Sequence, residues 1–321
     1  MSAVMRALVG PAFLAAVLSA CATEPLQTNV VASAQQPVPL EDKYSTSPDG
    51  VKIHYVASGK GPLVVLIHGY PDFSGSWTYL TPKLNDAYRV VALDTRGYNL
   101  SDKPAGVENY EMPKLVEDVA AVIKTEGYST ATVLGHDWGG SIAWMFAFTH
   151  PDMLDNLIIM STPHPSLFME QMRSNPAQQA SSQYARNFQK EGSEANMTAE
   201  GLARRIQDPQ LHAKYVEAFK RSSFAGMMNY YRANYPKTVG PDAKRPFLPD
   251  NPSEIPVPLL IIHGMKDTAL LAAGHNGTWE KAAKDTTLLM IPNAGHFVQF
   301  DAPGLVNGTV RNWLDMHRKK G

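Results

Sequence analysis

A short segment in the middle of the chain, GHDWGG (residues 135–140), places glycines around a central carboxylate. It follows an apolar run and precedes a helical pattern, which is the context of the G-x-S-x-G strand–turn–helix elbow, with Asp137 where that motif has serine. The glycines permit a strained turn that lifts the central side chain out of a sheet. Asp137 is therefore a candidate nucleophile, and the simpler alternative is an aspartate that caps the following helix.

Two other residues follow predicted strands in the order that a hydrolytic triad needs on this kind of fold: nucleophile, acid, histidine. Asp267 lies in HGMKD and His296 in PNAGHF. We expect Asp267 to orient His296, which would act as the base. The alternatives are a turn-forming aspartate and a loop histidine. His68, His136 and His263 adjoin strand-end glycines and are expected to be structural hydrogen-bonding groups.

A fourth segment, LIHGYP (residues 66–71), ends another predicted strand. A developing oxyanion needs two converging backbone N–H groups. We expect those of Tyr70 and Trp138 to supply them, and a cis bond before Pro71 would aim the Tyr70 amide inward. The alternative is a plain proline-containing turn.

The elements that must position these residues alternate between strand and helix. Short Val-, Ile- and Leu-rich runs predict strands at residues 51–57, 63–67, 89–93, 130–134, 157–160, 259–262 and 287–291, and helical patterns occupy 112–126 and 140–149. This repetition predicts an α/β fold with a doubly wound, mostly parallel sheet. Functional loops then lie at the carboxyl ends of the strands.

The alternation stops at Pro163 and resumes near Ile255. We predict a core of residues 45–163 and 251–321, with residues 164–250 inserted as a helical cap that has no strand run. Phe and Met are frequent in the cap and are expected mainly in its core: Phe168, Met169, Met172, Phe188, Phe219, Phe224, Met227 and Met228.

The segments HGYP, DTRGYNLSDKP (residues 94–104), GHDWGG and NAGH together resemble the α/β-hydrolase superfamily, and within it the epoxide hydrolases with an aspartate nucleophile. The resemblance covers residues 45–321. It implies two cap tyrosines that bind the epoxide oxygen, in stretches matched here by YARNFQ and YYR, which assigns Tyr184 and Tyr231. Phe188 and Trp138 are expected to contact the substrate.

The resemblance implies hydrolysis of a lipophilic epoxide to a vicinal diol through an alkyl ester of Asp137. A carboxylate that attacks saturated carbon forms an ester that water can cleave, whereas serine would leave an ether. Tyr184 and Tyr231 would stabilise and protonate the leaving oxygen, and His296 would activate water. No cofactor or metal is expected.

Two other functions fit parts of this pattern. A haloalkane dehalogenase would use the same nucleophile and triad, although Tyr70 stands where such enzymes commonly have a halide-binding asparagine. A non-catalytic surface binding protein of the same fold would normally lack triad residues, and all three are present here.

The composition indicates a globular protein and excludes several classes of function and of site. The chain has 321 residues with 44% apolar and 18% charged side chains, the mix of a folded globular protein. The formal charge of −1 argues against nucleic-acid binding. The single cysteine excludes an intramolecular disulfide and a Cys-based zinc site.

That cysteine ends an N-terminal pattern typical of export. Arg6 precedes an apolar stretch too short to span a membrane, and residues 1–20 therefore read as a signal peptide. The sequence LSAC resembles the lipobox of bacterial lipoproteins, which predicts lipidation of Cys21 and attachment to a membrane surface at the cell envelope, on the outer-membrane or periplasmic side. Residues 21–44 are predicted to be a tether. The alternative is ordinary cleavage at Ala20-Cys21-Ala22, which would release a periplasmic or secreted protein.

Overall fold

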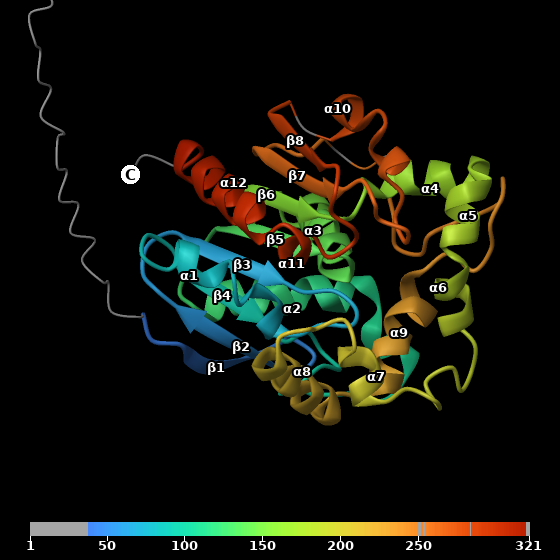
Figure 1. Cartoon of the computed structure of the whole chain (residues 1–321). Coiled ribbons are helices and arrows are strands. Elements are labelled where there is room, and N and C mark those ends of the chain that lie inside the picture. The colour runs from blue at the N-terminus through green and yellow to red at the C-terminus, as the bar shows by residue number, and fades with distance from the viewer. Residues whose placement is uncertain (1–37, 250–251, 253, 283, 319–321) are drawn as a thin grey trace, which may run out of the picture. The chain divides into compact units, whose positions relative to one another are not determined.

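The computed structural model describes residues 38–249, 252, 254–282 and 284–318, and Figure 1 labels their elements in chain order. Eight strands form one sheet: β1 Glu41–Thr46, β2 Lys52–Ser58, β3 Leu63–Ile67, β4 Arg89–Leu93, β5 Ala131–His136, β6 Leu154–Met160, β7 Leu259–Gly264 and β8 Thr286–Ile291.

The strand order is β1-β2-β4-β3-β5-β6-β7-β8. The strand β2 pairs antiparallel with β1 and β4, and every pairing from β4 to β8 is parallel. The predicted α/β fold with a doubly wound, mostly parallel sheet is confirmed. Since the parallel strands all point the same way, the loops that follow β3, β5, β7 and β8 meet at one edge of the sheet.

Both faces of the sheet are buried at its inner strands, such as β3, β5 and β7. Along β3, Val65 belongs to one hydrophobic cluster, while Val64 and Leu66 belong to a second cluster on the opposite face. A strand buried on both sides reads as a continuous apolar run, because alternate side chains enter different cores.

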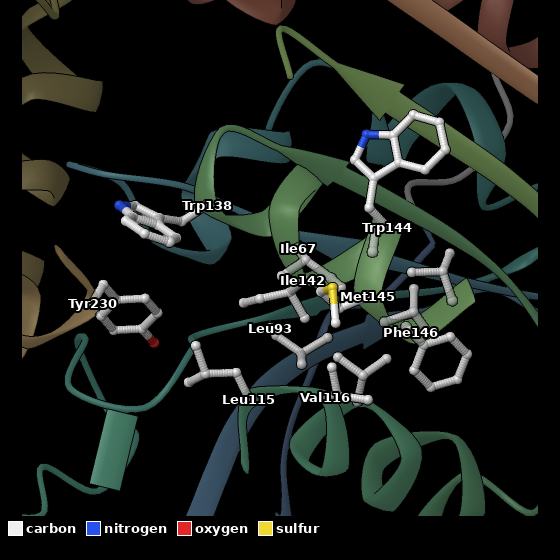
Figure 2. Packing of buried hydrophobic residues seen from close by; sticks show 14 of the residues in the cluster. Ile67, Leu93, Leu115, Val116, Trp138, Ile142, Trp144, Met145, Phe146 and Tyr230 are labelled. Atoms are coloured by element: carbon white, nitrogen blue, oxygen red, sulfur yellow. The ribbon is translucent and has the colours of Figure 1, made fainter. Parts of the chain in front are cut away.

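Helices α2 (Met112–Thr125) and α3 (Trp138–Thr149) pack on one face, and α1 (Thr81–Leu84) and α12 (Pro303–Met316) pack on the other. Every side chain of α3 from Trp138 to Ala147 is buried. A helix that is apolar all round lies inside a protein, and α3 is covered by the sheet, by α2 and by the cap. Figure 2 shows part of this cluster, to which Ile67 of β3, Ile142 of α3, and Leu115 and Val116 of α2 all belong.

Six helices lie between β6 and β7, and the described residues there form no strand: α4 Pro165–Ser174, α5 Pro176–Ser181, α6 Gln183–Phe188, α7 Ala199–Ala203, α8 Pro209–Arg221 and α9 Phe224–Asn234. Several begin at N-caps that the sequence displays, because Asn175, Thr198, Asp208 and Ser223 each accept a hydrogen bond from a first-turn amide. Proline at the first position of α4, α5 and α8 marks the same boundaries. The remaining short helices are η1 Ser74–Trp77, η2 Val107–Tyr110, η3 Pro151–Met153, η4 Ala272–His275, α10 Thr278–Lys281 and α11 Val298–Asp301.

Polar contacts join the cap to the core. The side chain of Asn234 accepts from the Met112 amide at 2.8 Å, and Arg205 of the loop between α7 and α8 donates to Asp72 at 2.7 Å. The guanidinium of Arg205 also stacks 3.9 Å from the ring centre of Phe297. The cap is thereby fixed beside the residue that follows His296.

The predicted tether extended to residue 44, and this boundary is wrong, because residues 41–44 belong to β1. The strand is mostly exposed and carries little apolar signal. Besides its antiparallel pairing with β2, it is held by charged side chains at its first residues. The guanidinium of Arg89 donates to both oxygens of Glu41 at 2.7 and 3.1 Å, and Nε2 of the buried His54 lies 3.1 Å from Asp42.

Candidate active site

Asp137 occupies the turn between β5 and α3, at φ 54° and ψ −117°. Side chains other than glycine rarely adopt a positive φ, and such strain concentrates at functional turns. The turn is tight because Gly139 passes so close to β3 that a Cβ there would lie 2.0 Å from the Ile67 carbonyl oxygen. The Thr162 hydroxyl donates to the Asp137 carbonyl at 3.0 Å and holds the turn. The sequence therefore folds locally into the elbow expected from its glycines.

The structure brings Asp137, Asp267 and His296 together from the ends of three strands. The Nδ1 atom of His296 lies 2.7 Å from Oδ2 of Asp267, and its Nε2 lies 3.4 Å from Oδ2 of Asp137. The other oxygen of Asp267 accepts from the amides of Ala269 and Leu270 at 2.8 and 3.0 Å. One carboxylate is thus fixed by the backbone and orients the imidazole toward the second.

These contacts set the charges in the site. Burial alone would lower the pKa of His296, but the charges of Asp267 and Asp137 and the hydrogen bonds to them outweigh it and raise this pKa to about 10. Burial raises the pKa of Asp137, and His296 more than reverses this, so that the pKa lies below its usual value. At neutral pH the resting site therefore holds an ionised Asp137 beside an imidazolium.

The Tyr70 amide donates to Oδ1 of Asp137 at 2.7 Å, and the Tyr70–Pro71 peptide bond is cis, as predicted. The Trp138 amide is the first of α3, and the opening amides of a helix lack partners within it. Of the two predicted amides, that of Tyr70 contacts the Asp137 carboxylate, and that of Trp138 begins α3 directly after Asp137.

A cavity of about 400 Å³, including the space at its mouth, lies over Asp137. The core and the cap both line it, and the lining residues are Asp137, Trp138, Ser141, Thr162, Pro163, Phe168, Tyr184, Tyr231, Tyr235, Arg245 and Leu270. Most of this lining is aromatic or aliphatic, as in sites for small apolar ligands.

Tyr184 of α6 and Tyr231 of α9 face this cavity from the cap, with ring centres 6.2 Å apart. Neither hydroxyl forms a hydrogen bond with another of the described residues. Burial raises the pKa of both phenols well above the usual value, so both remain protonated donors. The neighbouring Tyr230 is different, because its hydroxyl donates to the Arg96 carbonyl at 2.8 Å. Of the adjacent pair in YYR, Tyr231 is therefore the one that can reach a ligand.

Of the two residues predicted to contact the substrate, Trp138 lines the cavity and Phe188 does not, within the part of the chain that the structure describes. Trp138 packs against Tyr231 at a ring distance of 5.0 Å. Phe188 lies one turn after Tyr184 in α6 and makes edge contacts with Tyr70, Tyr184 and Tyr231. Phe188 therefore supports the rings that face the cavity.

The three histidines beside strand-end glycines, His68, His136 and His263, contact neighbouring protein groups, as a structural role requires. In His68, Nδ1 pairs with the Gly69 carbonyl and Nε2 accepts from the Thr95 amide at 3.1 Å. The ring of His136 bonds to the carbonyl oxygen of His296 at 2.8 Å. His263 contacts His275 at 3.0 Å, and its Nε2 lies 3.7 Å behind Asp267.

Sequence reasoning missed Arg245 and Tyr235, which line the cavity after α9. Tyr235 lies four residues after Tyr231, the spacing of one helical turn, so the sequence could have placed it on the same face. Arg245 stands in a segment without periodicity, and the sequence gives no indication of its position. Cys21 lies outside the described residues. In the part of the chain that the structure covers, no three His, Cys, Asp or Glu side chains cluster as a metal site, and no helix has the length and apolar character to cross a membrane.

Comparison with known proteins supports the class defined by this fold and triad. The profile of the alpha/beta hydrolase fold matches residues 62–303. Epoxide hydrolase 3 of Xenopus tropicalis is 34% identical over 83% of this chain and 75% of its own length. The AB hydrolase superfamily protein YfhM of Bacillus subtilis is 33% identical over 83% of this chain and 95% of its own length.

A solved structure agrees with these relatives. A mutant epoxide hydrolase from Bacillus megaterium, in complex with its product (R)-3-[1]naphthyloxy-propane-1,2-diol, superposes with a TM-score of 0.79 at 33% identity, covering 85% of this chain and all of the other. The chain belongs to the α/β-hydrolase family and, within it, to the epoxide hydrolases.

Proposed function

We propose that this enzyme hydrolyses a lipophilic epoxide to a vicinal diol through a covalent ester of Asp137. The observation that carries the proposal is the placement of the Asp137 carboxylate, backed by His296, in the same cavity as two phenols that have no other described partner. The diol bound to the Bacillus megaterium relative supports the reaction class.

In the first step, Oδ2 of Asp137 attacks a carbon of the epoxide ring. A carbon–oxygen bond forms to the enzyme as the ring bond from that carbon to the epoxide oxygen breaks. The released alkoxide takes a proton from Tyr184 or Tyr231, while the other phenol donates a hydrogen bond to it. Both phenols suit this role because burial keeps them protonated.

Before the second step, the imidazolium of His296 gives up its proton, which replaces the one lost by the phenol. The neutral His296 then takes a proton from water, and the hydroxide adds to Cγ of Asp137. The negative charge that develops on Oδ1 is already faced by the Tyr70 amide, and we assign the Trp138 amide as the second donor. Collapse of the adduct breaks the ester bond. The leaving diol oxygen takes the proton from His296. The carboxylic acid formed at Asp137 then passes its proton to His296, which restores the resting ion pair.

Replacing His296 by glutamine tests this order of events. The variant should still open the ring but stall at the ester, because the base is absent. Intact mass after exposure to an epoxide should then rise by the mass of the whole epoxide, and Asp137→Ala should give no adduct. An adduct of an alkyl group with loss of halide from a haloalkane would identify a dehalogenase, and full turnover by the His296 variant would refute the assigned base.

We also propose that the enzyme is exported and held at the cell envelope by lipidation of Cys21, with release as a periplasmic or secreted protein as the alternative. The proposal rests on the LSAC segment after a short apolar stretch, at the chain's single cysteine.

A further inference from the structure

Arg245 adds a cation to a cavity whose walls are otherwise mainly apolar and aromatic. Its side chain is partly buried, and it forms no ion pair with any carboxylate of the described residues. A guanidinium removed from water without a partner is costly, and an anion is the group that compensates it best. The proposed reaction steps do not use this charge.

The loop that carries Arg245 is fixed to the cap. The Gly240 amide donates to the Met172 carbonyl at 3.0 Å, and Nε of Arg173 donates to the Ala243 carbonyl at 3.1 Å. Both anchors lie on α4, which also contributes Phe168 to the cavity. Arg245 is therefore held at the cavity by the backbone on its N-terminal side.

Tyr235 lies beside Arg245 in the same lining and is only 7% exposed. Its hydroxyl is near Ser182, yet it has no hydrogen bond of ordinary geometry with the described residues. Burial raises the pKa of Tyr235 to about 12, with the charge of Arg245 acting in the opposite direction, so the phenol stays a donor. Burial lowers the pKa of Arg245 to about 10, which still leaves it charged at neutral pH.

The rest of the cavity does not neutralise Arg245. The negative charges of Asp137 and Asp267 both face the imidazolium of His296, and Asp137 is further held by the Tyr70 amide. Arg245 and Tyr235 thus present several unused N–H and O–H donors to the same space in which the epoxide must lie.

We propose that Arg245 and Tyr235 form an anion subsite, and that the preferred substrate is a compact epoxide that carries a carboxylate. This inference rests on the proposed epoxide hydrolysis and specifies its substrate class. A single guanidinium with one phenol matches a singly charged carboxylate, which accepts two parallel hydrogen bonds from a guanidinium. Because Arg245, Tyr235 and Asp137 line the same cavity, the acid and the epoxide belong to one molecule.

The test compares three probes that differ at one position: styrene oxide, its para-carboxylate, and the methyl ester of that acid. For the unmodified enzyme, kcat/KM for the carboxylate should exceed that for the ester by about tenfold or more, the size of a charge-assisted hydrogen bond. Arg245→Gln should abolish this ratio, and Arg245→Lys should retain part of it because the charge remains. The matched control is Lys244→Gln, which removes an exposed neighbouring cation outside the lining and should leave the ratio unchanged.

A measurement without variants guards against loss of folding. Benzoate should inhibit styrene oxide hydrolysis at least about tenfold more strongly than benzamide if the subsite binds carboxylate. Equal kcat/KM for carboxylate and ester, equal inhibition, or a ratio that survives in Arg245→Gln would each overturn the inference while epoxide hydrolysis stands. Failure of the unmodified enzyme to turn over any of the three epoxides would remove the proposed function and this inference with it.

Discussion

At the scale of single residues, the two oxygens of the Asp137 carboxylate have different partners. Oδ1 accepts the Tyr70 amide, whereas Oδ2 faces His296. The oxygen that must later carry the oxyanion is therefore held before any substrate binds, and preorganised donors of this kind require no rearrangement during reaction. The second oxygen is left for attack.

The two cap phenols can be tested against a close neighbour. Tyr231→Phe should slow ring opening by about a hundredfold, the typical effect of removing one donor from a developing oxyanion. Tyr230→Phe is the matched control: its hydroxyl bonds to the Arg96 carbonyl, so its loss should lower the free energy of unfolding by about 1 kcal/mol and leave ring opening intact. Single-turnover rates and urea unfolding measure the two effects. Similar rates in the two variants would contradict the assignment of Tyr231.

The pH dependence of the two steps should differ. Asp137 has a lowered pKa and is ionised throughout the neutral range, so ring opening should be flat between about pH 6 and 9. Ester formation removes the Asp137 charge that helps raise the pKa of His296, which must then fall below the resting value of about 10. Ester hydrolysis needs neutral His296 and should rise with pH before it levels off. Rapid-quench mass spectrometry at several pH values measures both rates, and a hydrolysis rate that falls as pH rises would contradict this role.

Residues next to strand ends could be predicted, and Arg245 could not. Asp137, Asp267 and His296 each follow an apolar run, so that parallel pairing alone brings them to one edge of the sheet. Arg245 reaches the cavity through anchors on α4, such as the bond from Arg173 to the Ala243 carbonyl. Its position depends on tertiary contacts that leave no periodic pattern in its own segment.

At the scale of elements, the loop between α7 and α8 holds the cap through Arg205. This side chain pairs with the fully buried Asp72 and stacks on Phe297, and the Tyr215 hydroxyl also donates to Asp72. The contact joins the cap to two core loops, one of which carries His296.

Removing the Arg205 charge should therefore destabilise the fold. Arg205→Gln leaves the buried Asp72 without its cation and should lower the free energy of unfolding by about 2–3 kcal/mol, somewhat less than for a fully buried pair because Arg205 is partly exposed. Arg204→Gln makes the same charge change at an exposed neighbour and should shift stability by less than about 0.5 kcal/mol. Urea unfolding compares them, and equal midpoints would show that the pair with Asp72 adds no net stability.

The interior strands could be predicted because they are buried on both faces, whereas β1 could not. Strands such as β3 consist of consecutive apolar residues. The residues of β1 are EDKYST, and they are fixed by backbone pairing with β2 and by the charged contacts of Arg89 and His54. Charge pairing across strands has no hydrophobic period, so a polar edge strand resembles a tether in sequence.

At the scale of the whole molecule, the site lies where the sheet and the cap meet. The predicted lipidation site, Cys21, belongs to residues 1–37, which the structure does not describe. Cys21→Ala in the full chain should shift the enzyme from the membrane fraction to the soluble fraction, because the acyl chains that would bind it to a membrane are lost. Hydrolysis of styrene oxide should be unchanged, since Asp137, Asp267 and His296 all lie at strands of the sheet, which begins at Glu41. Labelling with a fatty acid analogue and fractionation measure this, and unchanged partition would favour ordinary signal cleavage or another mode of attachment.

The pairing of β1 has a mechanical consequence. A pull applied through the N-terminal segment reaches the fold at Glu41, which is paired with Ala57 at the open end of the β1–β2 hairpin. A force directed away from β2 at this end would break the pairs of β1 one after another, beginning with Glu41 and Ala57. Arg89 and His54 contact Glu41 and Asp42, whose pairs with β2 are the first to be loaded. The edge strand is thus stabilised at the end from which β1 would separate from β2 if the N-terminal segment were pulled.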